Sequence, residues 1–390
     1  MVKLTINGRQ EEVESGSTIL QAAEKVGIFI PTFCHDEFGR FSNKECSKSD
    51  GIDQCKMCSV EVAGSNELVT ACDTEVTDGM VVQTESKKVK DKRIEVLNRI
   101  VSIHPMDCVN CVKLGGCKLQ KYCELYGVKD KTKETPHVHR NKDMSNRFYY
   151  QELEKCIRCG KCVRTCRELV GVNALTMVKH DGLNYVMPNI PDEVYRTKLK
   201  LGAGKEVTTE MKLKAYNDGL VGMADTECVS CGNCVSVCPV GALMPKSENE
   251  FREWETKKVV TTCTYCGVGC QIEYSVRNGK IVDAKPANGP SNEGLLCVKG
   301  KFAYDFINHK DRLVHPMIRK GGKHSPLVQV SWEEALDFAA KHIIEVRDKF
   351  GGDAIAGFSS ARTINEDNYL FQKMLRAAIG TNNVDHCARL

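Results

Sequence analysis

Cysteines dominate the residues that could carry chemistry in this sequence of 390 residues, because 22 are present and most are closely spaced. Two segments share the spacing C-x2-C-x2-C-x3-C, and Pro239 directly follows the second. The first contains Cys156, Cys159, Cys162 and Cys166, and the second contains Cys228, Cys231, Cys234 and Cys238. Thiolates are soft anionic ligands that suit iron, and two-residue spacers let one turn of backbone reach three corners of a cube. The spacing predicts [4Fe–4S] clusters rather than zinc knuckles, in which C-x2-C pairs are separated by longer loops.

This spacing is that of bacterial ferredoxins, in which the fourth cysteine of each copy ligates the cluster of the other copy. The sequence therefore predicts two clusters that exchange their last ligands. One cluster is assigned to Cys156, Cys159, Cys162 and Cys238. The other is assigned to Cys228, Cys231, Cys234 and Cys166.

A third set of four cysteines has a longer last spacer. It consists of Cys263, Cys266, Cys270 and Cys297. The spacing alone leaves a zinc site as an alternative. The surrounding sequence, CTYCGVGC at 263–270 and GLLCVKGKFAYDFINHKDRL at 294–313, closely resembles the N-terminal cluster domain of molybdenum- or tungsten-bis(pterin) oxidoreductases, formate dehydrogenases above all. The resemblance implies a [4Fe–4S] cluster, with Lys299 lying between that cluster and the pterin.

The N-terminal cysteines follow C-x20-C-x2-C-x13-C and are Cys34, Cys55, Cys58 and Cys72. The segments CKMCSVEV (55–62), TAC (70–72) and VTDGM (76–80) resemble the [2Fe–2S] domain of the large iron–sulfur subunit of NADH dehydrogenase (complex I) and of iron-only hydrogenases. The first spacer is about ten residues longer than that resemblance implies. It contains Cys46, so the first ligand is either Cys34 or Cys46. The Pro-Thr-Phe-Cys-His context at 31–35 favours Cys34.

A mixed histidine and cysteine set follows, with HPMDCVNC at 104–111 and GGC at 115–117. It resembles the [4Fe–4S] site of the same two families, which has one histidine and three cysteine ligands. The resemblance implies the ligands His104, Cys108, Cys111 and Cys117. Cys46, Cys123 and Cys387 then remain as free thiols. The whole set predicts one [2Fe–2S] and four [4Fe–4S] clusters, a series that can pass single electrons.

The composition agrees with a metal-rich cytoplasmic protein. Charged residues make up 27% and hydrophobic residues 42%, and no apolar run reaches the ~18 residues of a membrane helix. The N-terminus has no signal-peptide pattern, so we expect a cytoplasmic protein with no membrane association. Structural disulfides are rare in the cytoplasm, which favours metal ligation as the role of the cysteines. The formal charge of +4 does not favour a nucleic-acid partner, because metal ligation would convert most cysteines to thiolates.

The cysteine sets and the predicted elements together indicate a multidomain α+β protein. We expect a β-grasp [2Fe–2S] domain (1–85) with a hairpin over 2–14, a helix over 18–26 capped by Ser17, and strands near 59–63 and 80–84. A histidine-ligated [4Fe–4S] domain (86–140) would begin with a helix over 87–103. A double-cluster ferredoxin domain (141–250) and a small [4Fe–4S] domain (256–312) follow. The last segment (313–390) is predicted to be the beginning of an α/β molybdopterin domain, with a helix from Ser331, a strand at 354–358 and a helix over 364–378.

Three functional classes could use such a series of clusters. An iron-only hydrogenase would continue into its own catalytic cysteine motifs, which residues 251–390 do not show. The large iron–sulfur subunit of complex I usually lacks the complete double-ferredoxin spacing. A formate dehydrogenase alpha subunit of the acetogenic type matches every motif in order. This resemblance implies interconversion of formate and CO2 at molybdenum or tungsten held by two molybdopterin guanine dinucleotides. It also implies electron transfer past Lys299 and through the clusters to a flavin- and NAD(P)-binding iron–sulfur subunit or to hydrogenase subunits, since this chain has no Rossmann fingerprint.

The last residues, GTNNVDHCARL (380–390), resemble the stretch that precedes the metal-ligating selenocysteine or cysteine of formate dehydrogenases. That ligand is expected just after Leu390. Because UGA encodes selenocysteine, we expect the gene to continue past such a codon into a selenoprotein. The 390 residues alone are expected not to oxidise formate.

Overall fold

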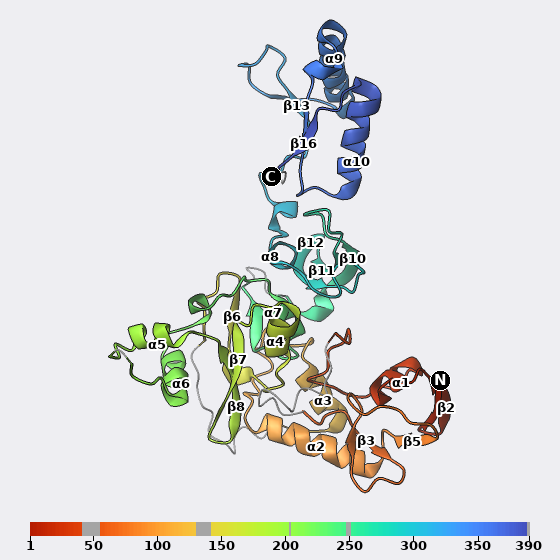
Figure 1. The fold of residues 1–390 in the computed structure, drawn as a ribbon, viewed down its shortest axis with the longest axis vertical. Coiled ribbons are helices and arrows are strands. Elements are labelled where there is room, and N and C mark those ends of the chain that lie inside the picture. The colour runs from red at the N-terminus through yellow and green to blue at the C-terminus, as the bar shows by residue number, and fades with distance from the viewer. Residues whose placement is uncertain (41–54, 130–141, 203, 247–250, 388–390) are drawn as a thin grey trace. The chain divides into compact units, whose positions relative to one another are not determined.

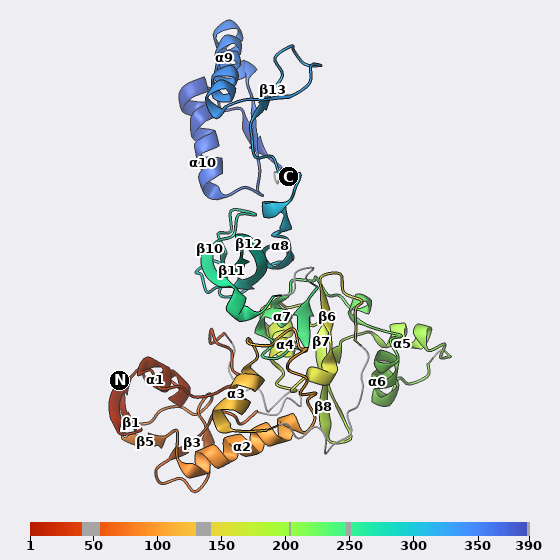
Figure 2. The same ribbon diagram turned by 180° about the vertical axis from the view of Figure 1, so that it is seen from behind.

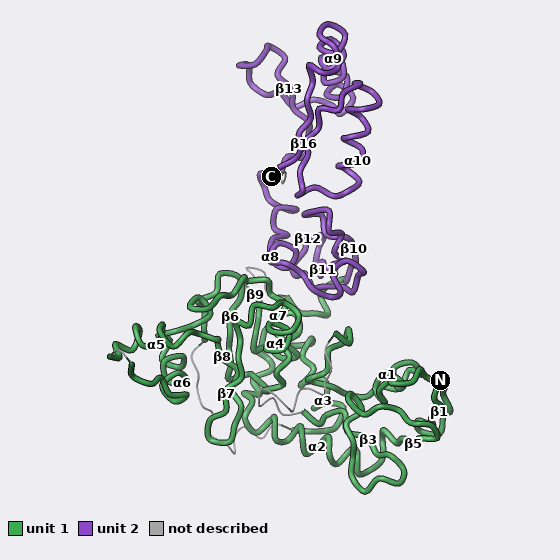
Figure 3. The backbone as a smooth tube through the Cα atoms, in the orientation of Figure 1, with its two compact units in different colours: residues 1–257 green, residues 258–390 purple. Residues whose placement is uncertain are grey.

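A computed structural model describes residues 1–40, 55–129, 142–202, 204–246 and 251–387. The chain divides into two compact units, residues 1–257 and residues 258–390, which are coloured separately in Figure 3. Cys46, Leu390 and most of the polar segment 129–147 lie outside the described residues. No helix in the described ranges is long and apolar enough to cross a membrane.

A five-stranded sheet with one helix forms the N-terminal part of the first unit (Figure 1). Its strands are β1 (Val2–Ile6), β2 (Arg9–Val13), β3 (Ser59–Val62), β4 (Val69–Thr70) and β5 (Met80–Gln83), in the order β2-β1-β5-β3-β4. The predicted hairpin is present, and both of its turn residues, Asn7 and Gly8, have positive φ as a tight β-hairpin requires. β1 and β5 are parallel, whereas the other pairs are antiparallel.

Helix α1 (Ile19–Lys25) buries Ile19, Leu20 and Ala23 in the core of this sheet. Its N-cap is Thr18 rather than the predicted Ser17. The reason is Gln21, which lies three residues after Thr18: the Gln21 amide donates to Thr18 Oγ1 (3.3 Å) and the Thr18 amide donates to Gln21 Oε1 (2.8 Å). These reciprocal bonds form a capping box that only Thr18 can close.

Two helices cover the next segment, α2 (Lys87–Val101) and α3 (Lys118–Tyr126). Arg93 of α2 is fully buried where α2 meets β3 and α3. Its guanidinium donates to Glu85 Oε1 (2.9 Å), to Tyr126 Oη (2.8 Å) and to the Ser59 carbonyl (3.2 Å). Arg93 therefore fixes the helices against the sheet.

The ferredoxin-like part is built from short elements, shown from both sides in Figures 1 and 2. They are α4 (Lys161–Arg164), α7 (Asn233–Val237), the antiparallel pair β6 (Tyr149–Gln151) with β9 (Leu243–Pro245), and the antiparallel pair β7 (Leu175–His180) with β8 (Leu183–Pro188). The charged insertion forms α5 (Asp192–Lys198) and α6 (Thr209–Asn217). Its buried Tyr195, Ala215 and Tyr216 pack against Leu153 and Met187, so the insertion shares their hydrophobic core.

The second unit begins with a three-stranded sheet of β10 (Lys257–Thr262), β11 (Gln271–Arg277) and β12 (Lys280–Pro286), in which β11 and β12 are antiparallel. Helix α8 (Val298–Phe302) follows. The C-terminal segment contains β13 (Met317–Ile318), β14 (Val328–Gln329), α9 (Trp332–Phe350), β15 (Gly357–Ser359), α10 (Asn365–Lys373) and β16 (Val384–His386), with β15 and β16 parallel. Ser331 caps α9 through the Glu334 amide (3.1 Å), as the sequence predicts. The strand predicted at 354–358 begins later, because Gly352–Ala354 forms a 3-10 turn.

Candidate iron–sulfur cluster sites

The two ferredoxin segments share one backbone conformation. In the first, Arg158 and Gly160 have φ of 61° and 71°, and in the second Ser230 and Gly232 have φ of 54° and 76°. The amides of Arg158 and Ser230 then point at the sulfurs of Cys156 and Cys228, each at 3.3 Å. Amides directed at sulfur stabilise the thiolate form that metal ligation requires.

Each segment contributes its first three cysteines to one pocket and its fourth to the other. Cys156, Cys159, Cys162 and Cys238 line one pocket. Cys166, Cys228, Cys231 and Cys234 line a second pocket. The structure thus brings together the two groups that the spacing predicts, and ligation of clusters by these thiols stays a prediction. Within the described ranges, no three His, Cys, Asp or Glu side chains are grouped to hold a single metal ion.

Several of the thiols that line the two pockets are buried away from water. Burial raises the pKa of the thiols of Cys159, Cys162 and Cys234. Iron in the pocket would supply the positive charge that favours the thiolates. Lys161, which is 3% exposed, lines the pocket of Cys156 and lies within electrostatic range of Cys159. A buried cation at this position favours the more negative, reduced form of a cluster.

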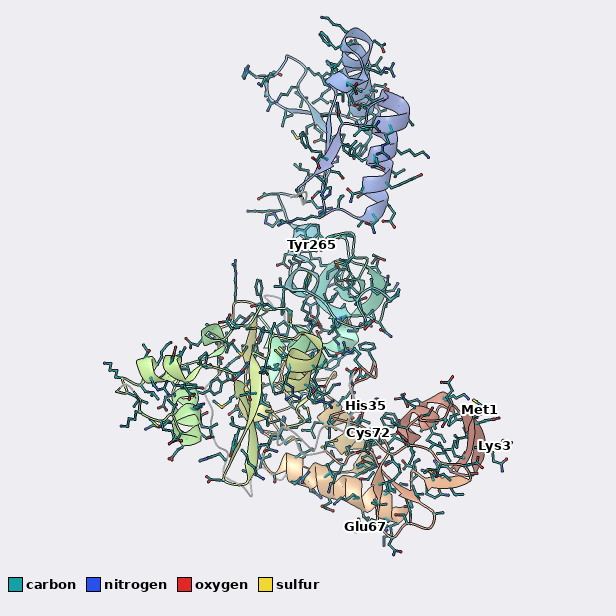
Figure 4. All side chains as sticks on the ribbon, viewed as in Figure 1. Met1, Lys3, His35, Glu67, Cys72 and Tyr265 are labelled. Carbon is teal, nitrogen blue, oxygen red and sulfur yellow. The ribbon has the colours of Figure 1, made fainter. Side chains whose placement is uncertain are left out.

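The N-terminal cysteines lie closer together. Cys34 Sγ is 3.4 Å from Cys55 Sγ, and Cys58 Sγ is 3.3 Å from Cys72 Sγ. Hydrogen bonds from the Cys55 and Cys72 thiols hold the pKa of Cys34 well below its usual value. Figure 4 shows Cys72 near His35, the neighbour of Cys34 in the chain. These four cysteines form one group that fits a [2Fe–2S] cluster, whereas Cys46, the other candidate for first ligand, lies outside the described residues.

The histidine and cysteine set lies between α2 and α3. His104 is buried just after α2, and its amide donates to the Ile100 carbonyl (3.1 Å). The Cys111 amide donates to the Cys108 carbonyl (3.2 Å), and Cys117 is the residue before α3. Cys123, left by the sequence as a free thiol, is buried on α3 within electrostatic range of Cys117 and Cys108. Burial and these two cysteines raise the pKa of Cys123 to about 12.

The candidate sites of the first unit adjoin one another through close contacts. A Cβ atom on Gly241, three residues after Cys238, would lie 3.0 Å from Cys111 Sγ. The Lys118 amide donates to the Pro239 carbonyl (3.0 Å), which joins the start of α3 to the same loop. Lys161 lies within electrostatic range of Glu37 in the N-terminal part. The pocket of Cys238 therefore borders the histidine and cysteine set and lies close to the N-terminal part.

The second unit brings its four cysteines together around the loop between β10 and β11. The Cys263 amide donates to the Cys270 carbonyl (2.8 Å), and burial together with the charges of Cys297 and Cys266 raises the pKa of Cys263. Cys297 is the residue before α8, and Lys299 is an exposed residue of this helix.

Two contacts that the sequence did not predict hold this site. Lys301 is buried against Asp283 (3.1 Å), which fixes α8 on β12. Asn365 Nδ2 donates to the Gly267 carbonyl (2.8 Å), inside the cysteine loop.

Family models match the chain in a continuous series. A "2Fe-2S iron-sulfur cluster binding domain" matches residues 1–87, an "NADH-ubiquinone oxidoreductase-G iron-sulfur binding region" matches 93–132, and a "4Fe-4S dicluster domain" matches 152–242. A "Molybdopterin oxidoreductase Fe4S4 domain" matches 256–309, and a "Molybdopterin oxidoreductase" domain matches 312–390. The predicted fold class is thereby confirmed. The chain therefore consists of a series of iron–sulfur cluster domains followed by the beginning of a molybdopterin oxidoreductase domain.

Similar proteins carry several names. The chain is 36% identical to a G-type NADH-quinone oxidoreductase subunit of Rhizobium meliloti over 100% of this chain and 40% of that protein. It is also 36% identical, with the same coverage, to "NADPH-Fe(3+) oxidoreductase subunit alpha" of Geobacter sulfurreducens. A Staphylococcus aureus protein with a provisional formate dehydrogenase name is 30% identical over 99% of this chain and 39% of that protein. The chain thus spans about two fifths of the length of these relatives.

Proposed function

We propose that this chain is the iron–sulfur portion of a formate dehydrogenase catalytic subunit, which interconverts formate with CO2, a proton and two electrons. The observation that carries the proposal is the unbroken order of candidate cluster sites along the chain up to the molybdopterin oxidoreductase segment. The four candidate sites of the first unit are followed along the chain by the Cys263 set with Lys299, and then by the molybdopterin oxidoreductase segment. The provisional name of the Staphylococcus aureus relative supports formate as the substrate.

The role of this chain would be to hold one [2Fe–2S] and four [4Fe–4S] clusters that pass electrons in series. Clusters bound at these residues would accept and release single electrons, at potentials set by burial, charge and hydrogen bonds to sulfur. Lys161 supplies a buried charge, and the amides of Arg158 and Ser230 supply hydrogen bonds. Molybdenum or tungsten with two molybdopterin guanine dinucleotides would belong to the longer subunit, next to Lys299.

The electron acceptor would be a separate subunit. No dinucleotide-binding fingerprint is present in these 390 residues, so NAD(P) chemistry requires a flavin- and NAD(P)-binding iron–sulfur partner. The names of the Rhizobium and Geobacter relatives, which are subunits of NADH and NADPH oxidoreductases, support such a partner. Hydrogenase subunits are the alternative acceptor.

The test uses the native complex, purified anaerobically from its source. Addition of formate should reduce the clusters, as seen by EPR, with one CO2 released for every two electrons accepted. Reduction by NADPH or NADH with no response to formate would refute the assignment of formate as substrate and leave the cluster series intact.

That outcome would favour the second candidate, an electron-carrying subunit of an NADH or NADPH oxidoreductase. The higher identity to the two relatives with those names, 36% against 30%, supports it. Reduction by formate in the absence of any nucleotide would exclude this candidate as the sole function.

A further inference from the structure

Tyr149 of β6 is a fully buried side chain that reaches one candidate cluster site from a distant part of the sequence. It lines the pocket of Cys166, Cys228, Cys231 and Cys234. Its phenol oxygen is 3.4 Å from Cys228 Sγ, although 79 residues separate the two. The pairing of Tyr149 with Pro245 of β9 holds the strand in this place. No spacing rule places a residue of β6 at this sulfur.

The direction of the hydrogen bond follows from the chemistry of ligation. A cysteine that ligates iron is a thiolate and has no proton to donate. A tyrosine phenol ordinarily titrates near pH ~10, so it carries its proton at neutral pH. The Tyr149 O–H is therefore the donor and Cys228 Sγ is the acceptor.

The side-chain amide of Asn146 is also directed toward Cys228 Sγ. Its Oδ1 accepts from the Phe148 amide (2.9 Å), which leaves Nδ2 to donate to Ser230 Oγ (3.0 Å). Nδ2 then lies 3.9 Å from Cys228 Sγ. The Ser230 amide donates to Cys228 Sγ as well (3.3 Å). Tyr149 thus completes a set of donors around one sulfur.

We infer that Tyr149 is a positioning residue that raises the reduction potential of the cluster held by Cys166, Cys228, Cys231 and Cys234, by donating a hydrogen bond to Cys228 Sγ. One-electron reduction adds a negative charge to the cluster and its thiolates, and a donated hydrogen bond stabilises the more negative state. This inference rests on the proposed cluster assignment. Among the residues lining this pocket, Tyr149 is the one with a polar side-chain hydrogen, apart from the cysteines.

The test is an EPR-monitored redox titration of the anaerobically purified protein carrying Tyr149→Phe, which deletes only the hydroxyl. One cluster should shift to a more negative potential by about a tenfold change in its reduced-to-oxidised ratio, or about 59 mV for one electron. Tyr195→Phe is the matched control, because Tyr195 is also buried in the first unit and its hydroxyl makes no hydrogen bond in the described structure. That variant should leave every potential unchanged.

A second measurement does not depend on the Phe variant folding. A fluorinated tyrosine placed at position 149 is a more acidic phenol and a stronger donor, so it should shift the same cluster to a more positive potential. Unchanged potentials in both Tyr149 variants, with the clusters present, would overturn the role of Tyr149 and leave the cluster assignment intact. Wild-type protein without iron–sulfur clusters would instead overturn the cluster assignment on which it rests.

Discussion

Substitution of Gly241 tests how closely the ferredoxin-like part packs against the histidine and cysteine set. A Cβ atom at this position would lie 3.0 Å from Cys111 Sγ and 3.3 Å from Lys113 Cβ, whereas ordinary contact is 3.4–4 Å. Gly241→Ala therefore requires the sulfur to move by about 0.4 Å, while metal-ligand distances tolerate only about ±0.2 Å. Overpacking of this kind costs about 1–3 kcal/mol.

We expect Gly241→Ala to remove or distort the cluster of His104, Cys108, Cys111 and Cys117, with loss of up to about four irons per chain. The assay is iron analysis with EPR of the anaerobically prepared variant. Gly202→Ala is the matched control, because its Cβ would meet no atom within 4 Å, and its iron content should equal that of the wild type. Full iron content and an unchanged EPR spectrum in Gly241→Ala would refute the reasoning.

Three further predictions follow from single contacts. Cys238→Ser should disturb the EPR signal of the cluster built on the first segment, and Cys166→Ser should disturb the other one; the reverse pattern would contradict the exchange of ligands. Arg93→Met removes three hydrogen bonds of a buried cation and should destabilise the protein by about 3 kcal/mol or more, measured by thermal unfolding of the first unit's helices; an unchanged melting temperature would show that Arg93 is dispensable. Asn365→Ala frees the Gly267 carbonyl and should broaden the EPR signal of the Cys263 cluster without changing the other signals; an identical spectrum would count against a positioning role for Asn365.

Sequence reasoning succeeded where the signal is local. The Asn7-Gly8 turn and the Ser331 cap follow directly from side-chain and backbone preferences, and the structure contains both. The spacing is that of bacterial ferredoxins, and the structure places Cys166 and Cys238 in the pockets that this likeness predicts, while their ligation of clusters stays a prediction.

Contacts between segments that are far apart in the chain could not be predicted from local sequence preferences. Tyr149 and Cys228 are 79 residues apart, and Asn365 and Gly267 are 98 residues apart. Neither pair has a spacing or a periodicity that the sequence could reveal, because each is created by strand pairing or helix placement in the folded chain.

The cluster count tests the central claim most directly. Anaerobically prepared protein should contain about eighteen irons per chain, with EPR after stepwise reduction showing one [2Fe–2S] signal among several [4Fe–4S] signals. A preparation rich in zinc with little iron, and without these signals, would contradict the account of this chain as a series of iron–sulfur clusters.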